Sequence, residues 1–186
     1  IGEYFDEQKI NKNFKRKFDI KKNEKYILVM LHPDTTNKND IDAKIILSKI
    51  SNTNLKVILF YPNVDANNSS ILSCISNYRN NKNFYMIRHM PLEGFIHVMA
   101  HASIMITNSS SGIREAASFG TPVLNIGARQ KNRERNQNTI DLDNNYDDLE
   151  SLINKYKNFR YPKINIYLKE NCSKLIVGKL LEKINY

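Results

Sequence analysis

One histidine stands where catalysis could use it. His32 directly follows a nearly continuous apolar run over residues 26–31, and it stands among Asp34, Thr35 and Thr36. Histidine is the usual general acid or base near neutral pH. A histidine in such a place can equally be a satisfied surface residue, so both interpretations stand.

A serine-rich segment offers a second kind of chemistry. Residues 109–112 read Ser-Ser-Ser-Gly and come after another apolar run, at the expected start of a helix. Free backbone N–H groups at a helix N-terminus, with the hydroxyls of Ser109 and Ser110, favour a phosphate. Glu115, one turn further, could accept hydrogen bonds from a ribose diol. The alternative is an ordinary N-cap serine with an acidic residue in the first turn.

The serine segment matches neither of the common nucleotide motifs. It lacks the Gly-Lys-Ser of a P-loop and the Gly-x-Gly-x-x-Gly of dinucleotide-binding enzymes. This argues against a nucleoside triphosphatase and against a dinucleotide enzyme. The basic loop 129–135, which also follows an apolar run, suits a diphosphate or a solvated face.

The chain offers no convincing metal site. His97 and His101 have the i, i+4 spacing of two metal ligands, but no third ligand accompanies them. We therefore expect these two histidines to pack rather than to bind a metal. Cys74 and Cys172 are too far apart in the sequence for a zinc knuckle and do not make a disulfide framework.

Short apolar runs alternate with amphipathic stretches along most of the chain. The runs predict strands at 26–31, 55–60, 84–87, 104–107 and 123–126, with a weak strand at 139–142. The stretches between and after them predict helices at 40–50, 68–77, 91–100, 110–119, 146–157 and 172–184. This alternation predicts an α/β fold, a doubly wound Rossmann-like parallel sheet whose ligands bind beyond the carboxyl ends of the strands.

Composition limits the classes of function. The 186 residues carry a net charge of +9, with 41% hydrophobic residues and no apolar stretch long enough to span a membrane. The lysines are scattered among asparagines rather than gathered on one face, which argues against nucleic acid as a partner. No signal peptide is visible, so we expect a cytoplasmic protein without a membrane partner.

The first residues differ in composition from the rest. Residues 1–24 are polar and basic and are expected to form a connector or the end of a preceding segment, and residues 25–186 one domain. The missing initiator Met fits a piece of a longer chain.

Several motifs in order resemble one enzyme family. They are the segments 31–37, 61–65, 83–91 and, most specifically, 100–130, which includes Thr-Asn-Ser-Ser-Ser-Gly-Ile-Arg-Glu. Together they resemble the C-terminal half of the UDP-N-acetylglucosamine 2-epimerases, closest to the hydrolysing branch that begins sialic acid biosynthesis. The resemblance covers about residues 25–142. It departs at 66–69, Ala-Asn-Asn-Ser, where the family commonly has a basic residue.

The resemblance implies a fold, a site and a partner domain. The fold is one half of a glycosyltransferase-B arrangement of two facing Rossmann-like domains, and the partner is the N-terminal domain of the same enzyme. In the implied site, His32 would be the catalytic residue beside the sugar, and Asn63 would lie beside the nucleotide. The backbone of Arg88, His89 and Met90 would hold uracil. Ser109 and Ser110 would bind the diphosphate, Glu115 the ribose, and Arg129 the UDP end.

The implied reaction is elimination of UDP across C1 and C2 of the sugar, followed by addition of water. The products would be N-acetylmannosamine and UDP, with no cofactor. No carboxylate here is a convincing base for the sugar proton, so the isolated chain is expected to bind UDP without turnover. Four alternatives remain open. Three are enzymes: a non-hydrolysing epimerase, a hydrolysing epimerase of a diacetamido-trideoxy sugar nucleotide, and a glycosyltransferase of the same architecture. The fourth, from another class, is a basic nucleic-acid-binding module. A homo-oligomer also remains open.

Overall fold

The computed structural model describes residues 18–21, 23–33, 41–64, 68–142 and 146–184. Most of the connector expected over 1–24 lies outside these residues, as do Asp34 to Thr36 and residues 66 and 67 of the departing segment.

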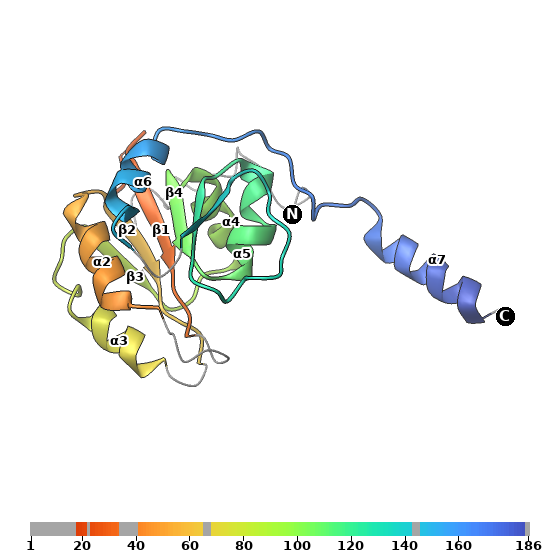
Figure 1. The fold of residues 1–186 in the computed structure, drawn as a ribbon, viewed down its shortest axis with the longest axis horizontal. Helices are drawn as coiled ribbons and strands as arrows, with labels where there is room; N and C mark the ends of the chain where they lie inside the picture. The colour runs from red at the N-terminus through yellow and green to blue at the C-terminus, as the bar shows by residue number, and fades with distance from the viewer. Residues whose placement is uncertain (1–17, 22, 34–40, 65–67, 143–145, 185–186) are drawn as a thin grey trace.

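Six strands form one parallel sheet. They are β1 (Tyr26–Met30), β2 (Lys56–Phe60), β3 (Phe84–Ile87), β4 (Ile104–Thr107), β5 (Val123–Ile126) and β6 (Thr139–Leu142). Their order is β3-β2-β1-β4-β5-β6, and every neighbouring pair is parallel (Figure 1). This order is that of a doubly wound sheet. Successive strands are added outward from β1 on one side and then outward from β4 on the other, so the strand order reverses between β1 and β4. All six predicted strands, the weak one included, are confirmed.

Two hydrophobic layers cover the two faces of the sheet. On one face lie α2 (Ala43–Asn52), α3 (Ser69–Ser76) and α6 (Leu149–Tyr156), and on the other α4 (Leu92–His101), α5 (Ser110–Arg114) and the 3-10 helix η3 (Ala116–Phe119). Along each strand, successive side chains point alternately into the two layers. Ile27 and Val29 belong to the first layer, whereas Leu28 belongs to the second. Such strands are buried on both faces, which explains why the sequence shows them as continuous apolar runs.

Residues at the start of the described chain pack on the domain. Phe18 and Ile20 are buried in the layer that contains α4, and the ring of Phe18 meets Tyr85 edge-on at 5.9 Å between ring centroids. This segment therefore contributes to the core.

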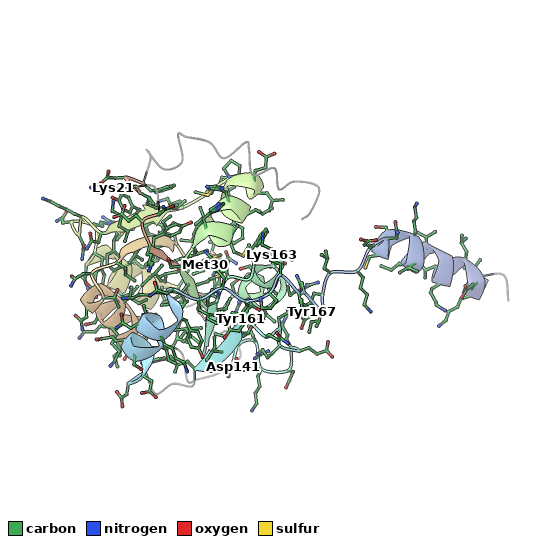
Figure 2. The ribbon with its side chains drawn as sticks, turned by 90° about the horizontal axis from the view of Figure 1, so that it is seen from above. Lys21, Met30, Asp141, Tyr161, Lys163 and Tyr167 are labelled. Atoms are coloured by element: carbon green, nitrogen blue, oxygen red, sulfur yellow. The ribbon has the colours of Figure 1, made fainter. Side chains whose placement is uncertain are left out.

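The last part of the chain leaves the domain. After α6, an extended stretch that includes Tyr161, Lys163 and Tyr167 runs along the body and leads to α7 (Cys172–Ile184), which projects away from it (Figures 1 and 2). No residue of α7 is buried. Among the described residues, no helix is long and apolar enough to cross a membrane.

Candidate functional site

The loops after β1 and β4 are joined at the point where the strand order reverses. The backbone N–H of His32 donates to Oδ1 of Asn108 at 2.8 Å, and Nδ2 of Asn108 donates to the carbonyl of His32 at 2.7 Å. Both residues are buried. In doubly wound sheets this reversal point, at the carboxyl ends of the strands, is where ligands bind.

A second contact reinforces this junction. The hydroxyl of Thr107 donates to the carbonyl of Met30 at 2.7 Å and accepts from the N–H of Ser109 at 2.9 Å. The last residues of β1 and β4 are thus held together, and the first serine of the serine segment is fixed beside them.

The ring of His32 is oriented by the loop after β2. The backbone N–H of Asn63 donates to Nδ1 of His32 at 3.3 Å. Because Nδ1 accepts this bond, the proton of the neutral ring is assigned to Nε2, which makes Nε2 the donor. Only 3% of His32 is exposed, so its position is set by the protein around it.

The serine segment begins a helix that is shorter than expected. The sequence predicts one helix over 110–119, but α5 ends at Arg114 and the 3-10 helix η3 follows after Glu115. Ser109 is the N-cap, and its Oγ accepts a long hydrogen bond of 3.5 Å from the N–H of Ser111. The cap interpretation is therefore confirmed for Ser109. A helix of five residues carries a weaker dipole than a long one, so any phosphate must rely on hydroxyls and nearby cations.

Glu115 lies at the break between the two helices, where it is partly buried. Burial raises the pKa of its carboxyl, while Arg114, Arg133 and a backbone hydrogen bond lower it. The net effect is a pKa above the ordinary value of 4.5. Hydrogen bonds donated by a ligand to this carboxylate would offset the cost of its burial.

Two side chains of the loop after β5 converge on the same junction. Nη1 of Arg129 donates to the carbonyl of Asn108 at 3.2 Å, and Nε2 of Gln130 donates to that carbonyl at 2.9 Å. Oε1 of Gln130 is buried and has no hydrogen-bond partner among the described residues. A buried polar atom without a partner is uncommon and often marks a functional site.

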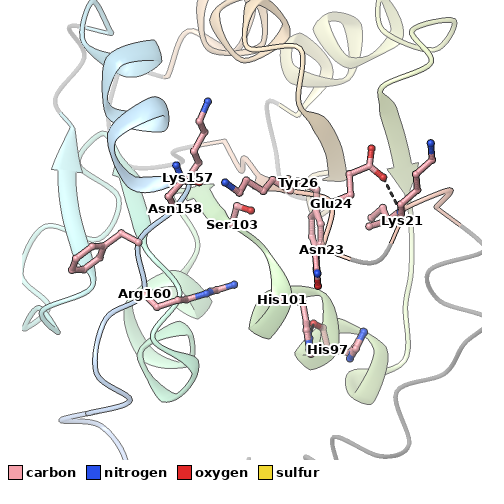
Figure 3. Close-up of a pocket in the computed structure, with 13 residues that line it drawn as sticks. Lys21, Asn23, Glu24, Tyr26, His97, His101, Ser103, Lys157, Asn158 and Arg160 are labelled. Atoms are coloured by element: carbon pink, nitrogen blue, oxygen red, sulfur yellow. Dashed lines mark hydrogen bonds between the residues drawn. The ribbon is translucent and has the colours of Figure 1, made fainter.

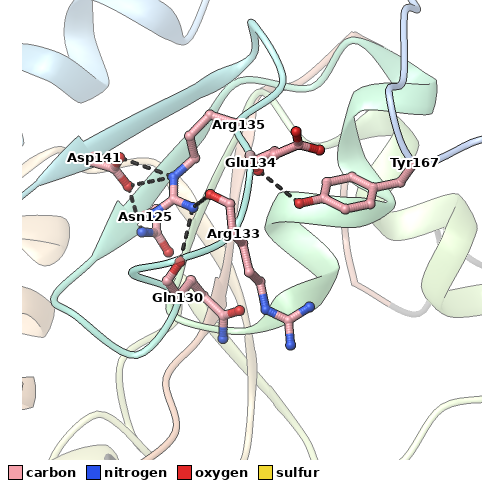
Figure 4. A network of polar contacts seen from close by, with 7 residues as sticks. All are labelled: Asn125, Gln130, Arg133, Glu134, Arg135, Asp141 and Tyr167. Carbon is pink, nitrogen blue, oxygen red and sulfur yellow. Dashed lines mark hydrogen bonds and ion pairs between the residues drawn. The ribbon is translucent and has the colours of Figure 1, made fainter.

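The rest of the basic loop is held by a polar network (Figure 4). Nε of Arg135 lies 3.0–3.1 Å from both carboxylate oxygens of Asp141 on β6, and Asn125 on β5 donates to the same carboxylate at 2.7 Å. The hydroxyl of Tyr167 donates to the carbonyl of Glu134 at 2.9 Å. Arg135 is thus a structural residue, whereas Figure 4 shows the guanidinium of Arg133 extending away from the network.

The predicted uracil stretch lies along the same edge, beyond β2. Arg88 is exposed, and its guanidinium lies over the ring of Tyr61 at 4.8 Å, which connects the loops after β3 and β2. His89 is exposed, and Met90 packs against the layer that contains α4.

The structure thus brings together part of the predicted site. His32, Asn63, Ser109 and Arg129 belong to one set of contacts around Asn108. The other predicted residues belong to neighbouring parts of the carboxyl edge. Arg88, His89 and Met90 follow β3, whereas Ser110 is the first residue of α5 and Glu115 is its C-cap.

Sequence reasoning missed two residues of this set, Asn108 and Gln130. The sequence did contain a feature that could have indicated them: Asn108 is an amide directly after a buried strand, and Gln130 is an amide in the loop after another. An amide can donate and accept at once, which suits it to tie two loops together.

The two histidines on α4 lie against each other. The rings of His97 and His101 lie 4.2 Å apart between centroids, and Nδ1 of His101 lies 3.0 Å from the carbonyl of His97. Within the part of the chain that the structure describes, no group of three His, Cys, Asp or Glu could hold a metal ion.

Comparison with known proteins places these loops in a family. The family model for UDP-N-acetylglucosamine 2-epimerase matches residues 3–181. A UDP-N,N'-diacetylbacillosamine 2-epimerase (hydrolyzing) from Legionella pneumophila is 34% identical over 150 residues, which cover 77% of this chain and 40% of that protein. A UDP-N-acetylglucosamine 2-epimerase from Neisseria meningitidis is 34% identical over 122 residues, which cover 64% of this chain and 32% of that protein.

A solved structure shows the same fold. The S. aureus protein MnaA, determined with UDP, superposes with a TM-score of 0.68 at 15% identity, and the match covers 98% of this chain and 51% of MnaA. Structural neighbours of this chain include epimerases and a heptosyltransferase, so the expected Rossmann-like fold of the glycosyltransferase-B type is confirmed. The chain spans about half the length of these structures or less. Its sequence motifs, its sheet and the family match agree, and the chain belongs to the UDP-N-acetylglucosamine 2-epimerase family.

Proposed function

We propose that this chain is the UDP-binding half of a hydrolysing UDP-N-acetylglucosamine 2-epimerase. The observation that carries the proposal is the junction of His32 and Asn108, which joins the loops after β1 and β4 at the reversal point of the sheet. Around this junction stand hydroxyls and a guanidinium, the groups that recognise a diphosphate.

Each part of UDP has a complementary group along the carboxyl edge. The diphosphate is assigned to Ser109, Ser110 and Arg129, and the ribose to Glu115. The backbone from Arg88 to Met90 is assigned to uracil. Asn63 is assigned a place beside the nucleotide, because its N–H contacts the ring of His32.

His32 is assigned to the end of the diphosphate nearest the sugar. With its Nδ1 occupied by Asn63, the ring offers the N–H of Nε2 to an oxygen of the leaving group. As UDP departs, negative charge grows on that oxygen. A fixed donor aimed at this charge stabilises the transition state more than the ground state.

The chemistry at the sugar itself is assigned to another domain. Elimination needs a base for the proton on C2, and the carboxylates that would serve are expected in the N-terminal half of the enzyme. We therefore propose that the 186-residue chain binds UDP but does not release free sugar on its own.

A second sugar substrate is favoured by one comparison. The Legionella relative is described as acting on UDP-N,N'-diacetylbacillosamine and shares 34% identity over 77% of this chain. That substrate differs from UDP-N-acetylglucosamine in the sugar and keeps the UDP. A half that holds UDP serves either substrate equally well.

Product analysis separates these reactions. A full-length protein in which this chain is joined to a first domain is incubated in turn with UDP-N-acetylglucosamine and with UDP-N,N'-diacetylbacillosamine, and the products are resolved by chromatography. The proposal expects free UDP and free N-acetylmannosamine from the first substrate. Turnover of the second substrate alone would transfer the assignment to the bacillosamine reaction. UDP-N-acetylmannosamine as the product would contradict hydrolysis.

A further inference from the structure

A cavity of about 500 Å³ lies at the amino edge of the sheet, away from the site described above. It is lined by Tyr26, the first residue of β1, and by Ser103, which immediately precedes β4. Helix α4 and the segment after α6 form other walls (Figure 3). His32 and Asn108 follow the opposite ends of the same two strands, so a strand length separates the cavity from the nucleotide site. Nothing in the proposed reaction uses this cavity, whose volume falls in the range of small-molecule sites.

The lining of the cavity is basic. Four of its 13 residues are Lys or Arg, against 28 of the 186 residues of the chain. The single acidic residue, Glu24, is already engaged, because its carboxylate accepts from the N–H of Lys21 at 2.7 Å and lies 3.3 Å from Nζ of Lys56. The cavity therefore has an excess of positive charge.

Arg160 and Lys157 differ in how they face the cavity. Figure 3 shows its guanidinium reaching across toward His101 and His97, whereas the amine of Lys157 points away. Nζ of Lys157 donates instead to Oδ1 of Asn154 at 2.7 Å.

The guanidinium of Arg160 is fixed in place without a counter-ion. Its Nη1 donates to Oγ1 of Thr121 at 3.0 Å, and the hydroxyl of Thr121 donates in turn to the carbonyl of Met99 at 2.8 Å. Although part of the side chain is exposed, burial lowers the pKa of Arg160, with the neighbouring Tyr26 opposing that shift. Among the described residues, no carboxylate lies within ion-pair distance of Arg160. An anion bound there would complete an ion pair that no described carboxylate makes, although the exposure of Arg160 keeps the cost of leaving this cation unpaired small.

Neutral polar groups also line the cavity. The hydroxyl of Ser103 and the amides of Asn23 and Asn158 line the cavity and can bond to hydroxyl groups of a ligand. Ile20 adds apolar surface. A charged contact beside several amides and a hydroxyl matches a phosphate attached to a small polyol.

We propose that this cavity binds a small phosphate monoester of the size of a sugar phosphate, with Arg160 as its anion contact, at a site separate from the nucleotide site. The planar fork of an arginine suits two phosphate oxygens at once.

Titration of the 186-residue chain with ribose 5-phosphate, followed by two-dimensional NMR in the presence of excess UDP, tests this proposal. Saturable shifts are expected at the amides of Tyr26 and Ser103, without shifts at Asn108. Ribose without phosphate should produce none. Inorganic phosphate should produce weaker ones. Arg160→Gln should raise the Kd at least tenfold, and Lys174→Gln, the same charge change on the exposed helix α7, less than twofold.

A second variant guards against a folding defect. Lys25→Gln alters another lining cation and leaves the contact between Arg160 and Thr121 intact, so it should raise the Kd about threefold in a folded chain. The proposal is overturned if binding does not saturate, if the shifts fall on Asn108 and Ser110, or if Lys174→Gln weakens binding as much as Arg160→Gln. Failure of UDP to bind would count against the proposed function and leave this cavity unaffected.

Discussion

At the scale of single residues, the amide of Asn108 connects more of the site than any charged group. Its side chain holds both backbone groups of His32, and its carbonyl accepts from Arg129 and Gln130. Loops after three strands, β1, β4 and β5, therefore depend on one residue. A change at Asn108 should alter the position of His32 and Arg129 together.

Asn108→Asp tests this dependence. The variant keeps an acceptor for the N–H of His32 but loses the donor to its carbonyl and adds a buried negative charge. We expect the free energy of unfolding to fall by about 1–3 kcal/mol and the Kd for UDP to rise at least tenfold, since the new charge repels the diphosphate. Chemical denaturation and calorimetric titration measure the two effects. Asn80→Asp, the same change at an exposed position, should leave both within error, and an equal loss in that control would show a general effect of charge.

Glu115 carries a pH dependence whose sign follows from its environment. Burial raises the pKa of this carboxyl above 4.5, so between 4.5 and the folded-state pKa the native state binds more protons than the unfolded state. The contribution of Glu115 to stability is therefore highest at low pH and falls as the pH rises through that window.

Glu115→Gln removes this titration. Relative to the wild type, the variant should gain stability as the pH rises above 4.5 and should lose that advantage below it, while its Kd for UDP at pH 7 rises about tenfold through loss of the ribose contact. Denaturation curves at several pH values, with the exposed Glu134→Gln as the control, check the sign. A variant whose relative stability falls with rising pH would contradict the assigned environment.

At the scale of elements, the serine segment is positioned by close packing of α5 against β4 and β5. A Cβ on Gly112 would lie 2.5 Å from Cγ2 of Thr107 and 3.0 Å from Cγ1 of Val123. Both neighbours are buried, so neither can move freely. The glycine is needed here for close approach of the helix to the sheet.

Gly112→Ala should push α5 away from the sheet. We expect a loss of about 1–3 kcal/mol in the free energy of unfolding, with weaker binding of UDP because Ser109 and Ser110 move with the helix. Gly178→Ala on α7 is the matched control, since no atom lies within 4 Å of its Cβ. There alanine should be neutral or slightly favourable, as it is the better helix former. Equal destabilisation by both variants would contradict the packing argument.

The sequence predicted the strands better than the helix that carries the serines. Buried strands such as β1 and β4 appear as short apolar runs because both of their faces are covered, and their bounds came out within a residue. The expected helix over 110–119 is interrupted at Glu115, and the left-handed Gly120 ends the 3-10 turn. Periodicity does not distinguish an α-helix from an α-helix followed by a 3-10 turn.

Part of the site was also predictable from the sequence, and part was not. The position after a strand was enough to predict that His32 and Ser109 lie at the carboxyl edge of the sheet. The role of Asn108 depends on the strand order, because Met30 of β1 and Thr107 of β4 are 77 positions apart in the sequence and are neighbours only in the folded sheet.

 His32 and Asn108 themselves are separated by 76 positions, and only the order β3-β2-β1-β4-β5-β6 brings them into contact.

At the scale of the whole molecule, the described chain is one six-stranded sheet covered on both faces, with an exposed helix that extends beyond it (Figure 2). The carboxyl edge of the sheet bears the nucleotide site that we propose, and the amino edge bears the basic cavity around Arg160. The two sites do not share a side chain, so variants at one should leave binding at the other unchanged.

The domain also limits what the chain can do alone. It spans 40% of the length of its Legionella relative and half of the structure of MnaA. We expect the 186-residue chain to bind UDP but to release no free sugar from UDP-N-acetylglucosamine, as followed by chromatography of the reaction mixture. Turnover by this chain alone would contradict the proposed division between two domains.

The central claim is that UDP binds at the carboxyl edge of the sheet, and calorimetric titration of the chain with UDP tests it most directly. We expect saturable binding at one site, with the Kd raised at least tenfold in the double variant Ser110→Ala with Glu115→Ala. The matched control, Ser70→Ala with Glu134→Ala, changes exposed residues of the same types and should bind like the wild type. Absence of saturable binding, or equal binding by the wild type and the double variant at Ser110 and Glu115, would contradict the site.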